Sequence, residues 1–181
     1  DARGNRKFNY EERDFLSEES ASFTYDEQDR LISSQVGEAS ADYSYSPDGY
    51  RLRKNNEYYV YDESGRLTAV CEKNGSEFSM SKQYIWGPDR VLAQIDGENI
   101  YYYLYNGHGD VIQITDSNGN IVNSYDYDVW GNFLKKEETI ENPFTYFGQT
   151  YDEETGLYYL RARYYDPTTG RFTQQDPAED G

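Results

Sequence analysis

The candidate for chemistry in this 181-residue chain lies near its C-terminal end. Asp166 and Asp176 each precede a proline, and Arg163 lies shortly before Asp166. Two carboxylates that share a proton can activate water, one as the base and one as the acid. The alternative role is structural, because an Asp before Pro often begins a turn. Both interpretations stay open for both aspartates.

Other candidates for chemistry are weaker. His108 is the only histidine and lies in the sequence Asn-Gly-His-Gly-Asp, which is typical of a turn. Asp116, Asn118 and Asn120 resemble the start of a calcium-binding loop, but Tyr127 occupies the twelfth position, where such a loop needs an acid. We therefore interpret these residues as turn formers and expect no metal site and no cofactor.

The elements that must position these residues form a repeat. Residues 61–67 read Tyr-Asp-Glu-Ser-Gly-Arg-Leu: an aromatic strand end, an Asp, a polar turn, and then an apolar residue that starts the next strand. The aromatic anchors of successive copies recur roughly every 20 residues, which indicates a repeat architecture. These anchors are Tyr25, Tyr45, Tyr61, Trp86, Tyr105, Tyr127 and Phe147.

Between the turns, hydrophobicity alternates with period two, and β-branched and aromatic residues are frequent, which predicts antiparallel hairpins. Asn74-Gly75 is the strongest single turn signal. Helical periodicity is weak, and the charged residues 135–142 are interpreted as a loop. The expected strands are 57–61, 66–71, 77–86, 91–95, 100–105, 111–115 and 121–127.

Two similar turns follow near the C-terminus, at residues 152–156 and 166–170. Each begins with Asp and ends with Gly. We expect Asp152 and Asp166 to accept hydrogen bonds from the turn amides, and Gly156 and Gly170 to adopt the left-handed conformation.

Composition limits the possible partners. The formal net charge is -17, from 17 basic and 34 acidic residues, which argues against binding nucleic acid or an anionic membrane. No apolar run approaches the length of a membrane span. The mean hydropathy of -1.03 is typical of disorder. However, 21 Tyr and 8 Phe can bury large ring areas, so we predict an ordered all-β protein with a tyrosine-rich core.

The Tyr-Asp units resemble the YD repeats of rearrangement-hotspot (RHS) proteins. Residues 156–172 read Gly-Leu-Tyr-Tyr-Leu-Arg-Ala-Arg-Tyr-Tyr-Asp-Pro-Thr-Thr-Gly-Arg-Phe, and Asp176-Pro177 follows. This segment is similar to the RHS-associated core, a long and specific motif. Together with the repeats, the resemblance covers most of the chain.

The resemblance implies an antiparallel sheet that spirals into a hollow β-shell. In bacterial polymorphic toxins and insecticidal toxin complexes, this shell encloses a C-terminal toxin. Residues 1–142 are then YD-repeat shell strands, and residues 143–181 are the core segment that closes the shell, all in one continuous fragment of a longer chain. The implied partners are the protein's own toxin domain and secretion-system or immunity proteins. The implied location is outside the cell or on its surface.

Many relatives cleave themselves just after the core, which gives an alternative function as an aspartyl autoprotease module. By resemblance, Asp176 is one catalytic acid, and Arg163 is the arginine that supports the site. The second acidic position lies near Tyr164 and Asp166, and Asp180 is a further candidate. We expect no turnover in this fragment, because it lacks the scissile bond.

Two kinds of binding are also expected. Exposed tyrosines could stack on sugars, so a second alternative is a cell-surface module that binds glycans. In addition, a single hairpin buries too little surface to fold alone, and a spiral sheet leaves open strand edges at its ends. The isolated piece is therefore expected to self-associate through sheet edges.

Overall fold

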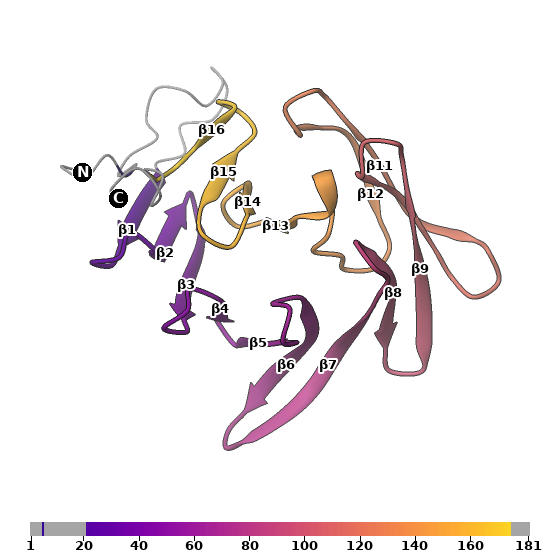
Figure 1. The fold of residues 1–181 in the computed structure, drawn as a ribbon, viewed down its shortest axis with the longest axis horizontal. Coiled ribbons are helices and arrows are strands. Elements are labelled where there is room, and N and C mark those ends of the chain that lie inside the picture. The colour runs from indigo at the N-terminus through magenta and orange to yellow at the C-terminus, as the bar shows by residue number, and fades with distance from the viewer. Residues whose placement is uncertain (1–4, 6–20, 175–181) are drawn as a thin grey trace. The chain divides into compact units, whose positions relative to one another are not determined.

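A computed structural model describes residue 5 and residues 21–174, and Figure 1 shows their course. The described residues form antiparallel β-strands and one short 3₁₀ helix, η1 (Tyr146–Gly148). The chain divides into two compact units: the first comprises Asp1–Asn55 and Tyr151–Gly181, and the second comprises Asn56–Thr150. Within the described part of the chain, no helix has the length and apolar character needed to cross a membrane.

The first unit contains two antiparallel sheets. In one sheet the strands lie in sequence order: β1 (Ala21–Tyr25), β2 (Leu31–Val36), β3 (Ala39–Tyr45) and β4 (Arg51–Lys54). The smaller sheet has the order β13 (Thr150–Asp152), β14 (Leu157–Tyr159), β15 (Tyr164–Asp166) and β16 (Arg171–Phe172).

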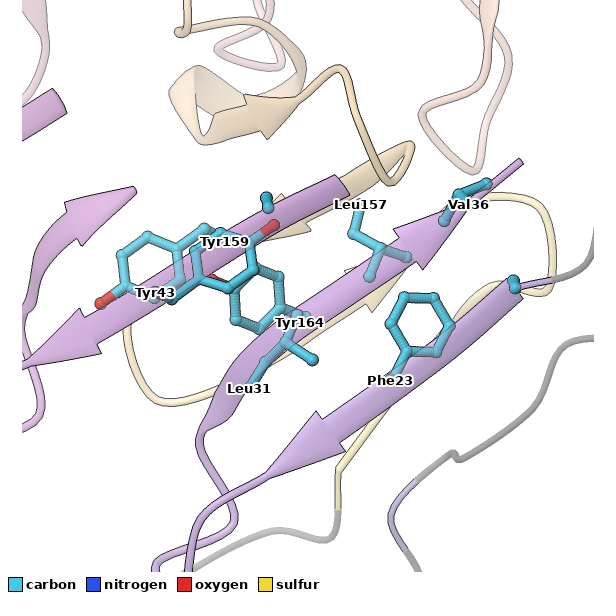
Figure 2. Close-up of a cluster of buried hydrophobic side chains, with 9 residues drawn as sticks. Phe23, Leu31, Val36, Tyr43, Leu157, Tyr159 and Tyr164 are labelled. Atoms are coloured by element: carbon cyan, nitrogen blue, oxygen red, sulfur yellow. The ribbon is translucent and has the colours of Figure 1, made fainter. Parts of the chain in front are cut away.

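A core cluster joins these two sheets. Alternate residues of a strand point to the same face, so β1, β2 and β3 direct one row of apolar side chains inward. Figure 2 shows that the smaller sheet supplies the other side of the cluster. Leu31 and Leu157 are 0% exposed. Burying a side chain of this size contributes about 1.5–3 kcal/mol. The labelled members are Phe23, Leu31, Val36, Tyr43, Leu157, Tyr159 and Tyr164.

The second unit is a sheet of consecutive antiparallel strands. The predicted strands are confirmed, with ends that differ by at most three residues. The strands are β5 (Glu57–Tyr61), β6 (Leu67–Asn74), β7 (Glu77–Trp86), β8 (Val91–Asp96), β9 (Asn99–Tyr105), β10 (Val111–Thr115), β11 (Ile121–Tyr127) and β12 (Phe133–Glu138).

The predicted loop at residues 135–142 is wrong in its first half. Residues 135–138 belong to β12, which pairs with β11 from Tyr127↔Phe133 to Asn123↔Glu138. The register places Lys135 directly opposite Asp126, a favourable cross-strand charge pair. Charged residues are common on edge strands, where they discourage unwanted pairing. The charge pattern therefore marks a sheet edge here.

An Asp at the end of the preceding strand closes four of the repeat turns. The Asp62 carboxylate accepts hydrogen bonds from the backbone N–H groups of Ser64 and Arg66, both at 2.9 Å. Its second oxygen binds Arg66 Nε at 2.8 Å. This arrangement fixes the turn and explains why an Asp follows the aromatic residue. Asp26, Asp116 and Asp128 form the same pattern with Arg30, Asn120 and Asn132.

Four of the aromatic anchors couple their repeat to the preceding one. Tyr105 Oη donates to the carbonyl of Val91 at 2.7 Å, and Trp86 Nε1 donates to the carbonyl of Leu67 at 2.7 Å. Tyr45 and Tyr127 make the same bond to Leu31 and Val111. At these four positions the anchor is an aromatic ring with a polar donor. Phe147, predicted as the last anchor, has no such donor; it lies in η1, has a φ of 52°, and is 56% exposed.

Removing one anchor hydroxyl should weaken this coupling measurably. We expect Tyr105→Phe to reduce the free energy of unfolding by about 1–2 kcal/mol, because the Val91 carbonyl loses its side-chain donor. The measurement is urea denaturation followed by tryptophan fluorescence. Tyr102→Phe is the matched control, because Tyr102 is on the same strand and 46% exposed. Equal losses in the two variants would contradict the coupling role.

Candidate functional site

A buried ion pair fastens the C-terminal segment to the sheet of the first unit. Arg51 begins β4 and is 1% exposed, and Asp152 ends β13 and is 0% exposed. Arg51 Nη1 donates to Asp152 Oδ2 at 2.5 Å, and Lys54 Nζ lies 3.7 Å from Asp152 Oδ1. A buried charge is tolerated only when it is paired and hydrogen-bonded. The pair therefore joins segments 101 residues apart.

Tyrosines enclose the guanidinium group of Arg51. Its central carbon lies 4.4 Å from the ring centroid of Tyr159 and 5.5 Å from that of Tyr43, within the range of cation–π attraction. The Arg51 backbone N–H donates to Tyr159 Oη at 3.0 Å. Tyr159 Oη in turn reaches the carbonyl of Gly49 at 3.3 Å.

The hydroxyl groups next to Arg51 form an ordered relay. Arg51 Nη1 donates to Tyr164 Oη at 3.1 Å, and Tyr45 Oη donates to the carbonyl of Leu31 at 2.7 Å. Each hydroxyl carries one proton, so Tyr164 must donate across its 3.1 Å contact with Tyr45. Burial raises the pKa of Tyr45 and Tyr164 far above the ordinary tyrosine value. Both hydroxyls stay protonated, so the relay is suited to holding structure.

The structure describes two of the three predicted catalytic residues, Asp166 and Arg163. Asp166 is 0% exposed, and its Oδ1 accepts hydrogen bonds from Thr168 N at 2.8 Å and Thr168 Oγ1 at 2.6 Å. The guanidinium carbon of Arg163 lies 3.7 Å from the ring centroid of Phe172. Asp176 and Asp180 fall outside the described residues. The contacts of Asp166 favour its role as a turn cap, and the catalytic assignment of Asp176, Asp166 and Arg163 stays a prediction.

The two C-terminal turns differ in what their aspartates do. Asp166 accepts from its turn amide as predicted, and the left-handed glycines are confirmed, with φ of 69° at Gly156 and 64° at Gly170. The prediction for the Asp152 carboxylate is wrong, because Thr155 N and Gly156 N donate to its main-chain oxygen. The carboxylate instead pairs with Arg51. A local turn motif gave no signal of a partner so distant in sequence.

In the second unit, the segment after β12 packs against one face of the sheet. Phe144 is 3% exposed, and its ring meets three aromatic rings edge to face. The centroid distances are 4.9 Å to Tyr84, 5.8 Å to Trp86 and 6.3 Å to Tyr103. Val111 N also donates to the carbonyl of Thr145 at 3.1 Å.

Two buried asparagines hold this segment in place. Asn123 Oδ1 accepts from the backbone N–H groups of Thr139 at 2.9 Å and Ile140 at 3.1 Å. Asn142 accepts from Phe144 N at 3.0 Å and donates to the Phe144 carbonyl. Both asparagines also donate to the hydroxyl of Tyr125. Sequence analysis missed them; the only available signal was that Asn123 occupies an inward position of its strand.

His108 lies in a turn, as predicted. Its Nδ1 is 2.9 Å from Asp110 Oδ1, and the same oxygen accepts from Phe147 N at 2.9 Å. Asn106 Nδ2 donates to Asp110 Oδ2 at 2.8 Å. Asp110, 5% exposed, therefore ties its turn to η1. Among residue 5 and residues 21–174, no three His, Cys, Asp or Glu side chains group in a way that could hold a metal ion.

Comparison with known proteins decides the family. The family model described as Teneurin YD-shell matches residues 1–84 and 80–179. The chain belongs to the Teneurin YD-shell family. The predicted YD-repeat resemblance and the predicted all-β antiparallel fold are both confirmed.

Two relatives that match this YD-shell chain are much longer proteins. The tRNA3(Ser)-specific nuclease WapA of Bacillus spizizenii is 40% identical over 166 residues, which cover 86% of the YD-shell chain and 7% of WapA. The tRNA(Glu)-specific nuclease WapA of Bacillus subtilis subsp. natto is 39% identical over 164 residues, with the same two coverages. The chain thus spans a small fraction of either nuclease.

A solved structure agrees with the YD-shell fold. A Photorhabdus luminescens Tc holotoxin pore that carries a mutated TccC3 matches with a TM-score of 0.72 and 20% identity. The match covers 98% of the YD-shell chain and 9% of the solved chain. At this identity the match establishes the fold. The chain is therefore a structural YD-shell segment, of a kind found in toxin-associated proteins.

Proposed function

We propose that this segment forms part of the wall and the closing core of a shell that encloses a C-terminal toxin in the same longer protein. The supporting observation is the comparison of the two WapA nucleases. They act on different tRNAs, yet they match this chain with 40% and 39% identity. The shared segment is therefore independent of the target, as a common container would be.

The buried contacts support the same role. The Arg51–Asp152 pair fixes the C-terminal segment of the first unit, and Phe144 with its two asparagines fixes the segment after β12. Both networks consist of buried, hydrogen-bonded side chains, which favours stable closure. In this proposal the whole protein is secreted or displayed on a bacterial surface. Its partners are its own toxin and the secretion-system or immunity proteins.

Protection from a protease tests the enclosing role. In the longer natural protein, we expect the region after the core to resist a broad-specificity protease under native conditions, because a wall surrounds it. Arg51→Met should expose that region and speed its digestion at least tenfold, whereas Arg53→Met, on the same strand, should not. Digestion of the wild-type C-terminal region as fast as an exposed linker would contradict the proposal.

Self-cleavage is the second candidate for the longer protein. It assigns Asp176 and Asp166 as the acids and Arg163 as the supporting residue. Cleavage that Asp176→Asn leaves intact would remove Asp176 from the mechanism. Glycan binding by exposed tyrosines also remains a prediction, for which Tyr102, 46% exposed, is the most accessible aromatic candidate on the β9 strand.

A further inference from the structure

β7 lies between β6 and β8, and the hairpin that it forms with β6 extends beyond the end of its pairing with β8. β8 pairs with β7 only from Trp86 to Gln83, whereas β6 pairs with β7 as far as Glu77. Figure 1 shows the turn of this hairpin away from β8. Residues 77–81, here called the arm edge, thus have β6 on one side and, within the described chain, no strand pairing on the other.

Hydrogen-bond geometry shows which backbone groups face the open side. Lys73 N donates to the carbonyl of Asn56 at 3.4 Å, so the main chain of Lys73 faces away from β7. Phe78 is paired directly with Lys73 and must therefore belong to a non-hydrogen-bonded pair of the β6–β7 ladder. Its N–H and C=O then point to the open side, and those of Met80, two residues on, do the same.

The side chains on this edge are apolar and accessible. Phe78 is 57% exposed and Met80 is 55% exposed. Because they are two residues apart on one strand, they share a face. The Phe78 ring meets the Tyr58 ring edge to face at 4.9 Å, which holds it on the sheet. An open edge with apolar side chains is a template for pairing with another strand.

We propose that the arm edge pairs antiparallel with the arm edge of a second copy of this chain, about a two-fold axis at Ser79. In this register Phe78 lies opposite Met80 of the second copy, and the reverse pair is equivalent by symmetry. The two pairs form four backbone hydrogen bonds, which satisfies every outward group of Phe78 and Met80. Each pair also brings a thioether against an aromatic ring, which is a favourable contact.

The register favours a second copy, because the arm edge is complementary to itself: the same Phe78–Met80 pair forms on both sides of the axis. Glu77 lies opposite Ser81 of the second copy, so no like charges face each other. Two other registers fit less well. With the axis at Phe78, Met80 would lie opposite the turn residue Ser76. With the axis at Met80, the pairing would extend past Ser81 into the part of β7 where its register with β6 shifts. The contact is short, and each copy carries a net charge of -17, so association should strengthen as salt screens the repulsion.

A cysteine cross-link tests the register. Cys71 is replaced first by Ser, since it is a free thiol. At a non-hydrogen-bonded pair the two Cα atoms lie about 4.5 Å apart, within disulfide range. Ser79→Cys should therefore form an intermolecular disulfide under mild oxidation. Glu77→Cys is the control on the same arm, because its copies lie about 14 Å apart. We expect at least tenfold more cross-linked dimer from Ser79→Cys.

A second variant separates pairing from folding. Met80→Pro removes an N–H that points outward, so the β6–β7 ladder keeps its bonds while strand addition is blocked. It should abolish the Ser79→Cys cross-link and any rise of the sedimentation coefficient with concentration or salt. Equal cross-linking of Ser79→Cys and Glu77→Cys, or unchanged association of Met80→Pro, would overturn the proposal. A wild-type chain that stays monomeric at about 1 mM in high salt would do so as well.

Discussion

Arg51→Met should lower the free energy of unfolding of the first unit by about 3–5 kcal/mol, because it leaves the Asp152 carboxylate buried without its main partner. Lys54 Nζ, at 3.7 Å from Asp152 Oδ1, is too distant to replace a direct hydrogen bond. The loss should appear as faster hydrogen exchange at the amides of β14 and β15, measured by mass spectrometry.

A double variant separates the cost of an unpaired charge from the value of the pair. Arg51→Met with Asp152→Leu removes both charges, and apolar replacements of buried pairs are often neutral or stabilising. We therefore expect the double variant to be more stable than Arg51→Met alone. Arg53→Met is the control, since Arg53 is on the same strand, makes an exposed hydrogen bond to the Asn55 carbonyl, and should cost less than about 1 kcal/mol. A double variant as unstable as the single one would show that the pair itself supplies the stability.

Phe144→Ala should have the largest effect in the second unit. Phe144 is 3% exposed and meets Tyr84, Trp86 and Tyr103. Truncating a buried Phe leaves a cavity and costs about 3–5 kcal/mol. Both tryptophans, Trp86 and Trp130, lie in this unit, and Trp86 is 5.8 Å from the Phe144 ring, so tryptophan fluorescence in urea denaturation reports this unit.

The neighbouring Phe147 provides the matched control for this measurement. Phe147 is three residues away and 56% exposed, so Phe147→Ala should change the free energy of unfolding by less than about 1 kcal/mol. Similar losses from both variants would mean that the segment after β12 is held by something other than the buried ring.

Local sequence patterns predicted the strands and turns well, and for a physical reason. A strand that buries one face must alternate apolar and polar side chains. An Asp at a strand end accepts hydrogen bonds from the turn amides, so the roles of Asp62 and Asp166 could be predicted from their neighbours alone. Charge misled the interpretation of residues 135–138, since a charged edge strand and a charged loop have similar composition.

Contacts between residues far apart in the chain left no comparable pattern in the sequence. Arg51 and Asp152 meet across 101 residues, and nothing around Arg51 distinguishes it from other strand arginines. Spacing also selected Phe147 as the last anchor, whereas the buried ring is Phe144, because the chain leaves the sheet after β12. Within the candidate site, the sequence predicted the turn at Asp166 and named Tyr164 only as a neighbour. It did not predict the hydrogen bonds that join Tyr164 to Arg51 and Tyr45.

The anchor bonds have a consequence for how such proteins can change in length. Tyr105 and Trp86 each donate to a carbonyl in an earlier repeat, and the same bond recurs at Tyr45 and Tyr127. These four junctions are therefore held by the same kind of contact, a side-chain donor on a main-chain carbonyl. A repeat bounded by two such junctions can be duplicated or deleted with the junction on either side intact, so the sheet can grow or shrink in steps of one repeat.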